Sequence, residues 1–432
     1  MGEILNTRSI TLFGAVCIGI GGMVGGGIFA VLGEAVSLAH GSTFIAFAIA
    51  GLVALLTSYS YAKLSVKFQS KGGTVTFVDK AFGDNILSCS VNLMLWLSYL
   101  VTISLYATAF ASYGKTFFTH QSPFLDHILI SVAIIVPALI NIVSASFVSK
   151  SESLIVFIKV SLLVVVVAVG SFYIDTSKIA PQNWTSPLSM VVAGMIIFVA
   201  YEGFELIANS AEDIQNPDQN LPRAFYISVV IVIALYIAIS IITVGSVDEK
   251  TLETAKDYAL AVAVEPSLGK LGFSIVAFTA LLSTFSAINA TIYGNARLGY
   301  IIAKDGRLPK QLMNSKRGVP FDGVLYTTFF SLILANSIDL TEIAIIGSAG
   351  FLLIFFVVNI SAYKLRKEIN ASRSLLIVSS SFTFMALTTL IYHTYTSNPH
   401  AVIIFLAFII IAVGFELIYG RYFRNSSIKK EL

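Results

Sequence analysis

Apolar residues occur along the chain in long blocks, and short polar segments separate the blocks. A membrane-spanning helix needs about 20 mostly apolar residues, and the blocks have roughly that length. They do not show the short alternating pattern of a transmembrane β-barrel, whose strands have about 10 residues. We therefore predict an all-α polytopic membrane protein with twelve transmembrane helices, at residues 9–38, 42–66, 85–114, 124–146, 151–174, 188–212, 223–246, 271–302, 320–336, 341–363, 374–394 and 400–420.

The composition supports this prediction and excludes several functions. Of the 432 residues, 56% are hydrophobic and 12% charged, about half the charged fraction of a soluble domain, and the mean hydropathy is +0.85. The connections are short, so we expect no attached soluble domain. The chain shows no nucleotide-binding loop and no nucleophile triad, and its two cysteines lie within or beside spans. We therefore expect no enzymatic activity, no cofactor and no metal site.

Basic residues predict the orientation of the chain, because cytoplasmic loops carry an excess of Lys and Arg. With both termini inside, 21 of the 27 basic residues lie on the inner side and five on the outer side. Lys159, within the fifth predicted span, is the remaining one. We therefore predict cytoplasmic termini and a location in the cell membrane. The formal charge of +3 reflects this bias, and we expect the lipid bilayer, not nucleic acid, as the surroundings of the chain.

The first span contains six glycines within residues 19–29, GIGGMVGGGIF. Glycine lowers helix propensity by about 1 kcal/mol per residue, so this density favours a break in the helix near residues 23–26. The alternative is close packing against another helix, since Gly21–Gly25 and Gly22–Gly26 both have the spacing of small residues at helix contacts. The sequence alone leaves both interpretations open.

Three ionisable residues lie deep within apolar spans. Glu202 and Glu205 flank Gly203 in the sixth span, in residues 198–206, FVAYEGFEL. Lys159 lies nine residues beyond Lys150, which places it about 14 Å along a helix, near the middle of a hydrocarbon core of roughly 30 Å. Charged groups at this depth are costly and commonly functional. Spans one and six are antiparallel by parity, and interruptions at matching positions are typical of a transporter site.

Several motifs resemble the amino acid–polyamine–organocation superfamily of permeases. They are GGGIF in span one, AYEGFE in span six, AEDIQNPDQNLPRA at residues 211–224, SAINATIYG at 286–294 and AKDGRLP at 303–309. The resemblance covers essentially the whole chain and looks closest to the proton-coupled, broad-specificity amino acid transporters. It implies a five-plus-five inverted-repeat (LeuT-like) core with helices one and six unwound. The repeats would be residues 1–174 and 188–363, followed by two further helices and a tail at 374–432.

The same resemblance implies a substrate site at the unwound segments. There the positive end of a half-helix and its free amides suit a carboxylate, and we assign this role to Gly25, Gly26 and Gly27. The substrate ammonium is expected to meet carbonyl groups of helices one and six. Further expected site residues are Met23 as a lining residue, Ile20, Gly21, Phe198, Val199 and Tyr201 as carbonyl donors to the site, Tyr201 and Phe204 as walls or gates, and Glu202 as a contact of the amine.

Lys159 falls where sodium-coupled relatives bind a sodium ion, so the resemblance implies coupling to H⁺. When charged, Lys159 is expected to bond carbonyls near Gly21 and the hydroxyl of Ser283 or Ser286, and to release them on losing its proton. Glu205 is a second candidate for carrying protons. The expected function is amino acid–proton symport of neutral or broad specificity. The alternatives are a sodium-coupled transporter, a sodium-independent amino acid or polyamine exchanger, and a non-transporting amino acid sensor. The oligomeric state stays open.

Overall fold

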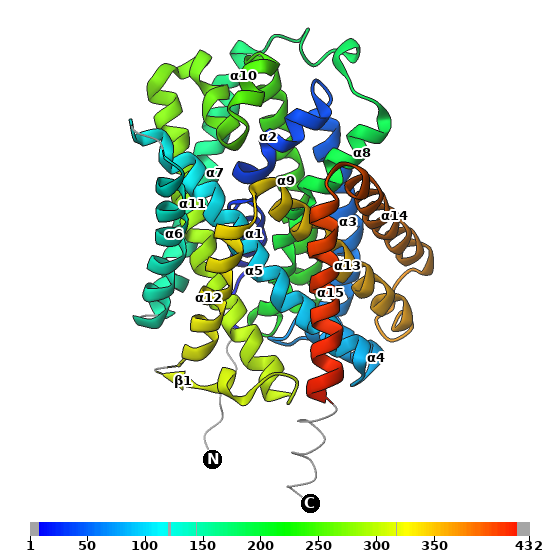
Figure 1. Cartoon of the computed structure of the whole chain (residues 1–432). Helices are drawn as coiled ribbons and strands as arrows, with labels where there is room; N and C mark the ends of the chain where they lie inside the picture. Colours follow the sequence, from blue (N-terminus) through cyan, green and yellow to red (C-terminus); the bar gives the residue numbers. More distant parts are fainter. Residues whose placement is uncertain (1–7, 120–121, 144, 317, 421–432) are drawn as a thin grey trace, which may run out of the picture.

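Long helices make up most of the computed structural model, which describes residues 8–119, 122–143, 145–316 and 318–420 (Figure 1). The helices are α1 Leu12–Met23, α2 Gly27–Ala39, α3 Thr43–Lys67, α4 Thr74–Phe82, α5 Ile86–Gly114, α6 Pro123–Val143, α7 Ala145–Gly170, α8 Pro187–Ile196, α9 Pro217–Ser246, α10 Glu249–Thr254, α11 Ala259–Lys304, α12 Phe321–Ser337, α13 Leu340–Lys364, α14 Arg373–Ser397 and α15 Pro399–Tyr419.

Short 3₁₀ helices and one small hairpin complete these described segments. The 3₁₀ helices are η1 Lys115–Phe117, η2 Ser171–Tyr173, η3 Pro181–Asn183, η4 Ile197–Asp213, η5 Lys256–Tyr258 and η6 Lys310–Met313. The strands β1 Ser315–Lys316 and β2 Val319–Pro320 pair antiparallel. With η4 the exception in length, these elements serve as connections, and the protein is a polytopic all-α membrane protein.

Many helices begin at residues that satisfy the free amides of a first turn. The side chains of Thr11, Asn85 and Asp339 accept hydrogen bonds from backbone amides at the starts of α1, α5 and α13. Ser186 does the same for α8, and Pro187 follows it at the first helical position, where a missing amide hydrogen has no cost. These local signals fix the ends of spans whose interiors are uniformly apolar.

Ten helices in the described part of the chain are long and apolar enough to cross a membrane, and the bent pair of α1 and α2 would make eleven. The predicted block at 320–336 corresponds to α12, which has 17 residues. Twelve spans therefore stay a prediction, as does the division into inverted repeats. Span seven begins earlier than expected, at Pro217, because this proline and Asn216 start α9 before the apolar block.

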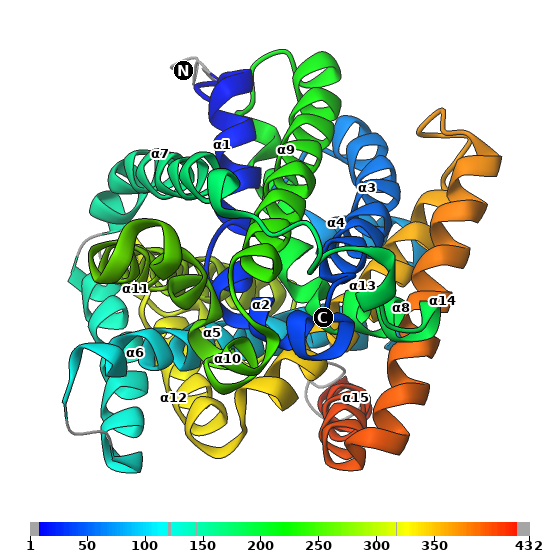
Figure 2. The same cartoon turned by 90° about the horizontal axis from the view of Figure 1, so that it is seen from above.

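The helices surround a centre occupied by α2, with α14 and α15 at the edge of the bundle (Figure 2). α15 ends at the same end of the molecule as β1, opposite α10 (Figure 1). The basic residues predict that the β1 end is cytoplasmic, and we name the two ends inner and outer accordingly. Some residues used for that prediction lie outside the described residues, as do the two termini: Arg317, Arg421, Arg424, Lys429 and Lys430.

Candidate functional site

The structure has a break in span one. α1 ends at Met23, α2 begins at Gly27, and the two helices are bent by 48° relative to each other. The three linking residues include Gly25 and Gly26, which lower the local preference for a helix. The glycine pattern predicted a break at this place.

The break turns several backbone carbonyls away from the helix, and side chains of other helices bond them. Tyr236 of α9 donates its hydroxyl to the Met23 oxygen at 2.7 Å. Ser283 of α11 donates to the oxygens of Val24 and Gly25, at 3.2 and 2.6 Å. Because backbone groups at membrane depth must be bonded within the protein, these hydroxyls let the broken span persist in a bilayer.

The glycines of span one also permit close packing, so both interpretations of the motif hold. A methyl group on Gly203 of span six would overlap the carbonyl carbon of Gly22. A methyl group on Gly27 would lie 2.7 Å from the Ala200 Cα, far inside van der Waals contact. Spans one and six therefore meet backbone to backbone on both sides of the break.

Span six differs from the predicted unwound helix. It passes without a gap from α8 into η4, a 3₁₀ helix of 17 residues, although such helices rarely exceed four residues. At the junction, Ser348 of α13 donates to the Ile196 carbonyl at 2.6 Å and accepts from the Val199 amide at 2.9 Å. One hydroxyl thus satisfies the two groups that the change of winding releases, and no unwound segment is needed.

Glu205 lies on η4 with only 2% of its surface exposed. Its carboxyl group accepts hydrogen bonds from three hydroxyls of other helices. Thr74 and Tyr61 donate to Oε2 at 2.8 and 3.2 Å, and Tyr99 donates to Oε1. A carboxyl group that only accepts, from three donors, has the pattern expected of its ionised form.

Glu202 is equally buried, at 3% exposure, but has fewer partners. Thr102 of α5 donates to its Oε1 at 2.8 Å. No hydrogen-bonding group among the described residues reaches its Oε2. Buried polar atoms without partners are uncommon and costly, so this oxygen is open to a donor that comes from a ligand.

Lys159 of α7 is 1% exposed, and its Nζ lies 3.1 Å from the Gly21 carbonyl oxygen. This is the carbonyl contact that the sequence analysis placed there. Ser283, one of the two hydroxyls expected near Lys159, donates instead to Val24 and Gly25. Ser286 lies with Lys159 on one cavity. The ammonium therefore bridges span five to the broken span one.

A small buried cavity brings these groups together. Its space of about 30 Å³ accommodates two or three water molecules at roughly 10–15 Å³ each, but no amino acid. Residues of five elements line it, among them Gly21 and Gly22 of α1, Tyr99 and Tyr106 of α5, Lys159 of α7, Glu202 and Glu205 of η4, and Ser286 and Thr291 of α11.

A second cavity, of about 100 Å³, continues from the first toward the inner end. It shares Tyr99, Leu206, Ala290 and Thr291 with the buried cavity and reaches Lys71 and Arg297. Both basic residues belong to the side that the charge bias assigns to the cytoplasm. The buried groups therefore lie at the end of a passage from the inner face.

Ion pairs close the opposite, outer end. Lys256 of η5 contacts the Glu34 carboxylate of α2, and Lys178 lies 2.9 Å from Asp248 at the start of α10. His40, at the end of α2, contacts Glu249. The segment from residue 248 to Gly269 thus covers α2 as a lid, and Gly269, with φ of 63°, turns the chain into the transmembrane part of α11.

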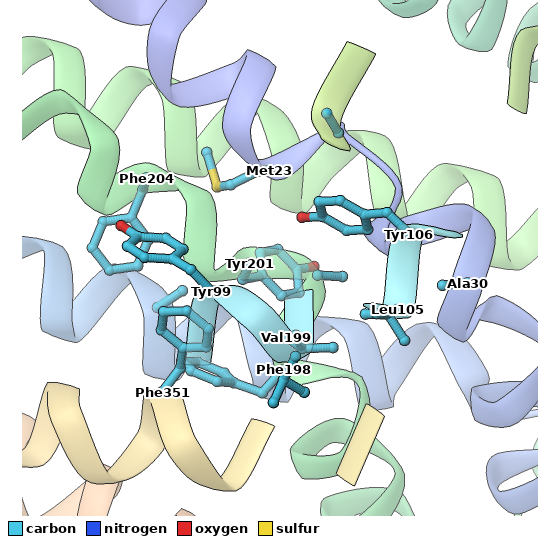
Figure 3. Close-up of a cluster of buried hydrophobic side chains, with 14 of the residues drawn as sticks. Met23, Ala30, Tyr99, Leu105, Tyr106, Phe198, Val199, Tyr201, Phe204 and Phe351 are labelled. Carbon is cyan, nitrogen blue, oxygen red and sulfur yellow. The ribbon is translucent and has the colours of Figure 1, made fainter. Parts of the chain in front are cut away.

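Five of the residues predicted for the site line the buried cavity: Gly21, Lys159, Glu202, Glu205 and Ser286. The others surround it without lining it: Ile20, Met23, Gly25, Gly26, Gly27, Phe198, Val199, Tyr201, Phe204 and Ser283. Tyr106 packs against Gly26 and also lines the cavity, so it stands between the cavity and the amides of α2 (Figure 3). The binding roles of all these residues stay predictions.

Tyr99, Thr102 and Tyr106 were missed in the sequence, although a signal was present. Their spacing of three and four residues places them on one face of α5. All three are buried, at 1 to 7% exposure, and their polar atoms face Glu202, Glu205 and the cavity. A polar stripe along an otherwise apolar span is the pattern that identifies them.

These features define a class: a multi-pass membrane protein with a broken span, buried charges at the break and a passage to one face. The amino acid permease family matches residues 10–426, and the chain belongs to that family. An uncharacterized protein of Methanocaldococcus jannaschii is 33% identical, with 96% of each chain covered. The inner membrane transport protein YbaT of Escherichia coli is 30% identical over 96% of this chain and 97% of its own length.

A third relative is named for its substrates. The branched-chain amino acid permease BcaP of Bacillus subtilis is 22% identical over 85% of this chain and 83% of its own length. The family and the names of these relatives indicate a transporter of amino acids, not an enzyme.

Proposed function

We propose that the protein moves amino acids across the cell membrane by alternating access, as a proton-coupled symporter of neutral or broad specificity. The observation that carries the proposal is the cavity at the break in span one, where Lys159, Glu202 and Glu205 are all buried. Buried ionisable groups on an aqueous passage are the usual parts of a proton-driven transporter. The relative named for branched-chain amino acids supports a neutral substrate.

The closed outer lid and the inner passage correspond to one state of such a cycle. Opening toward the outside requires the ion pairs of the lid, such as Lys256–Glu34, to separate. Binding of the substrate carboxylate at the first turn of α2 requires the Tyr106 ring to move from Gly26. Both movements expose amides at the positive end of α2, where an anion is stabilised.

Lys159 supplies the coupling in this proposal. The charged ammonium holds α7 to the Gly21 carbonyl at 3.1 Å, close to the break. Loss of its proton removes this contact and favours a state in which the helices separate. Substrate binding and proton binding then change each other's affinity by the same factor, as linkage requires.

The test uses the purified protein in liposomes. Wild-type uptake of labelled leucine is expected with a proton gradient alone and not with a sodium gradient alone. Lys159→Ala is expected to lower proton-driven uptake at least tenfold and to flatten its dependence on pH. Lys304→Ala, at the exposed inner end of α11, is the matched control and should keep the wild-type profile.

Two outcomes would contradict the proposal. Uptake driven by sodium alone would show a different coupling ion. A Lys159→Ala protein with the wild-type pH profile would remove the lysine from the mechanism. Thermal unfolding of both variants separates a loss of coupling from a loss of folded protein.

A further inference from the structure

Glu202 and Glu205 lie three residues apart on η4 but have opposite environments. Glu205 accepts from three hydroxyls, whereas Glu202 accepts from Thr102 alone and presents Oε2 without a partner among the described residues. The open oxygen belongs to a side chain that is 97% buried, by its 3% exposure, and lines the cavity. This arrangement is that of a binding group, since a purely structural carboxyl group would be satisfied.

The charges around the cavity leave Glu202 without a counter-ion. The titratable groups that face it are Lys159 from α7, Glu205 from its own element, and Tyr99 and Tyr106 from α5. Those parts of α1 and α11 that line the cavity contribute glycine, alanine, serine and threonine only. If both carboxyl groups and the ammonium are ionised, the sum is one negative charge, which is costly inside a membrane.

One positive charge balances the site, and two sources can provide it. We propose that Oε2 of Glu202 takes either a proton or a cationic side-chain group of the substrate, so that the two exclude each other. A neutral amino acid then enters with one proton more than a cationic amino acid such as lysine. This inference rests on the proposed transport function and adds the rule by which the site reads substrate charge.

Thr102 has a positioning role in this arrangement. Its hydroxyl holds Oε1 at 2.8 Å, which leaves Oε2 as the oxygen directed to the ligand. The exchange is a simple balance: the proton that leaves Oε2 returns to water through the inner passage, and an ammonium or guanidinium group takes its place. No covalent step is involved.

The decisive experiment needs no variant. Purified protein in liposomes takes up labelled leucine or lysine while a trapped dye reports the internal pH, so that protons per substrate are measured. Lysine is expected to move with one proton fewer than leucine, and each should carry the same total charge. Equal proton numbers for the two substrates, or a lysine that neither enters nor competes with leucine, would overturn the inference.

Glu202→Gln tests the assignment to this residue. The amide cannot hold a cation as a carboxylate does, so the ratio of lysine to leucine uptake is expected to fall at least tenfold, and the difference in proton number should disappear. Glu416→Gln, a buried glutamate of α15 with 4% exposure, is the matched control and should keep both. A wild-type ratio in Glu202→Gln would contradict the assignment.

The outcomes separate this inference from the transport proposal. If no labelled amino acid enters under any gradient, the transport proposal itself fails. If leucine enters with protons but lysine carries the same number, transport stands and the charge rule fails. Thermal unfolding of Glu202→Gln shows whether the variant is folded, and the wild-type proton count decides the question even where it is not.

Discussion

Spans one and six meet at the centre of the molecule, but their backbones depart from the α-helix in different ways. Span one leaves the helix entirely between Met23 and Gly27, and hydroxyls from α9 and α11 bond the carbonyls that become free. Span six stays wound but tightens into η4, and Ser348 alone satisfies the junction. A true break therefore depends on donors from several helices, whereas a change of winding depends on one.

The difference follows from the two sequences. Span one has six glycines within residues 19–29, but residues 197–213 contain a single glycine, Gly203. Side chains restrict the backbone of span six to helical conformations, so it responds to close contact by tightening. The glycines of span one impose no such restriction. The comparison predicts that span one is the part whose geometry other helices hold in place.

The largest effect is expected where the two spans touch. Gly203→Ala places a methyl group on the backbone of Gly22, with no flexible side chain to move aside. We expect a loss of about 3 kcal/mol or more of stability, at the upper end of overpacking, together with loss of uptake. Thermal unfolding in detergent and uptake in liposomes measure both.

Gly414→Ala of α15 is the matched control for this change. Nothing lies within 4 Å of the methyl group it would add, and alanine favours the helix by about 1 kcal/mol over glycine. It should therefore be neutral or slightly stabilising. Equal stability of the two variants would show that spans one and six are not in backbone contact.

A smaller effect is expected from Tyr236→Phe, which acts on both spans. It removes the hydroxyl that donates to Met23 at 2.7 Å and to Ala200 at 3.3 Å. The ring and its contact with Tyr201, at 5.0 Å between centroids, remain. Leaving buried carbonyls unbonded costs about 1–3 kcal/mol, so we expect a loss of this size in thermal unfolding.

Tyr392→Phe on the surface of α14, where the side chain is 72% exposed, serves as the control and should not change stability. A Tyr236→Phe protein as stable as this control would mean that the Met23 carbonyl finds another donor. In that case the broken span would be less dependent on α9 than the geometry indicates.

Much of the fold was predictable because apolar length and glycine density act locally. Each predicted apolar block contains a helix, and the break in span one lies at the glycines. The tight winding of η4 was not predictable. It depends on the contact between Gly203 and Gly22 and on Ser348 of α13, which are 181 and 145 residues away in sequence, counted from 203 to 22 and from 203 to 348.

The candidate site was predictable in its charged residues and not in its hydroxyls. Lys159, Glu202 and Glu205 are conspicuous in apolar spans, because a charge at that depth needs a reason. Tyr236 and Ser283 are not conspicuous, since the chain has 18 tyrosines and hydroxyls are tolerated in membrane helices. Which of them faces the break depends on helix rotation, and this is decided by packing.

The sharpest test of the comparison is a pair of serine variants with the smallest expected effects. Ser283→Ala leaves the carbonyls of Val24 and Gly25 without their hydroxyl in a segment that has no helical ladder to rejoin. Ser348→Ala affects a wound segment, where the Val199 amide can return to a carbonyl of the preceding turn. We expect a loss of about 1–2 kcal/mol for Ser283→Ala and about 0.5–1 kcal/mol for Ser348→Ala, within the range for single buried hydrogen bonds.

Thermal unfolding under one set of conditions compares the two proteins directly, and uptake adds a second measurement. Ser283→Ala should also lower uptake, because it loosens the link that positions α2, whereas Ser348→Ala should affect uptake less. The reverse order of stabilities would mean that span six, not span one, is held in shape by its neighbours. The broken span would then be rigid by itself, and the hydroxyls of α9 and α11 would follow its geometry without determining it.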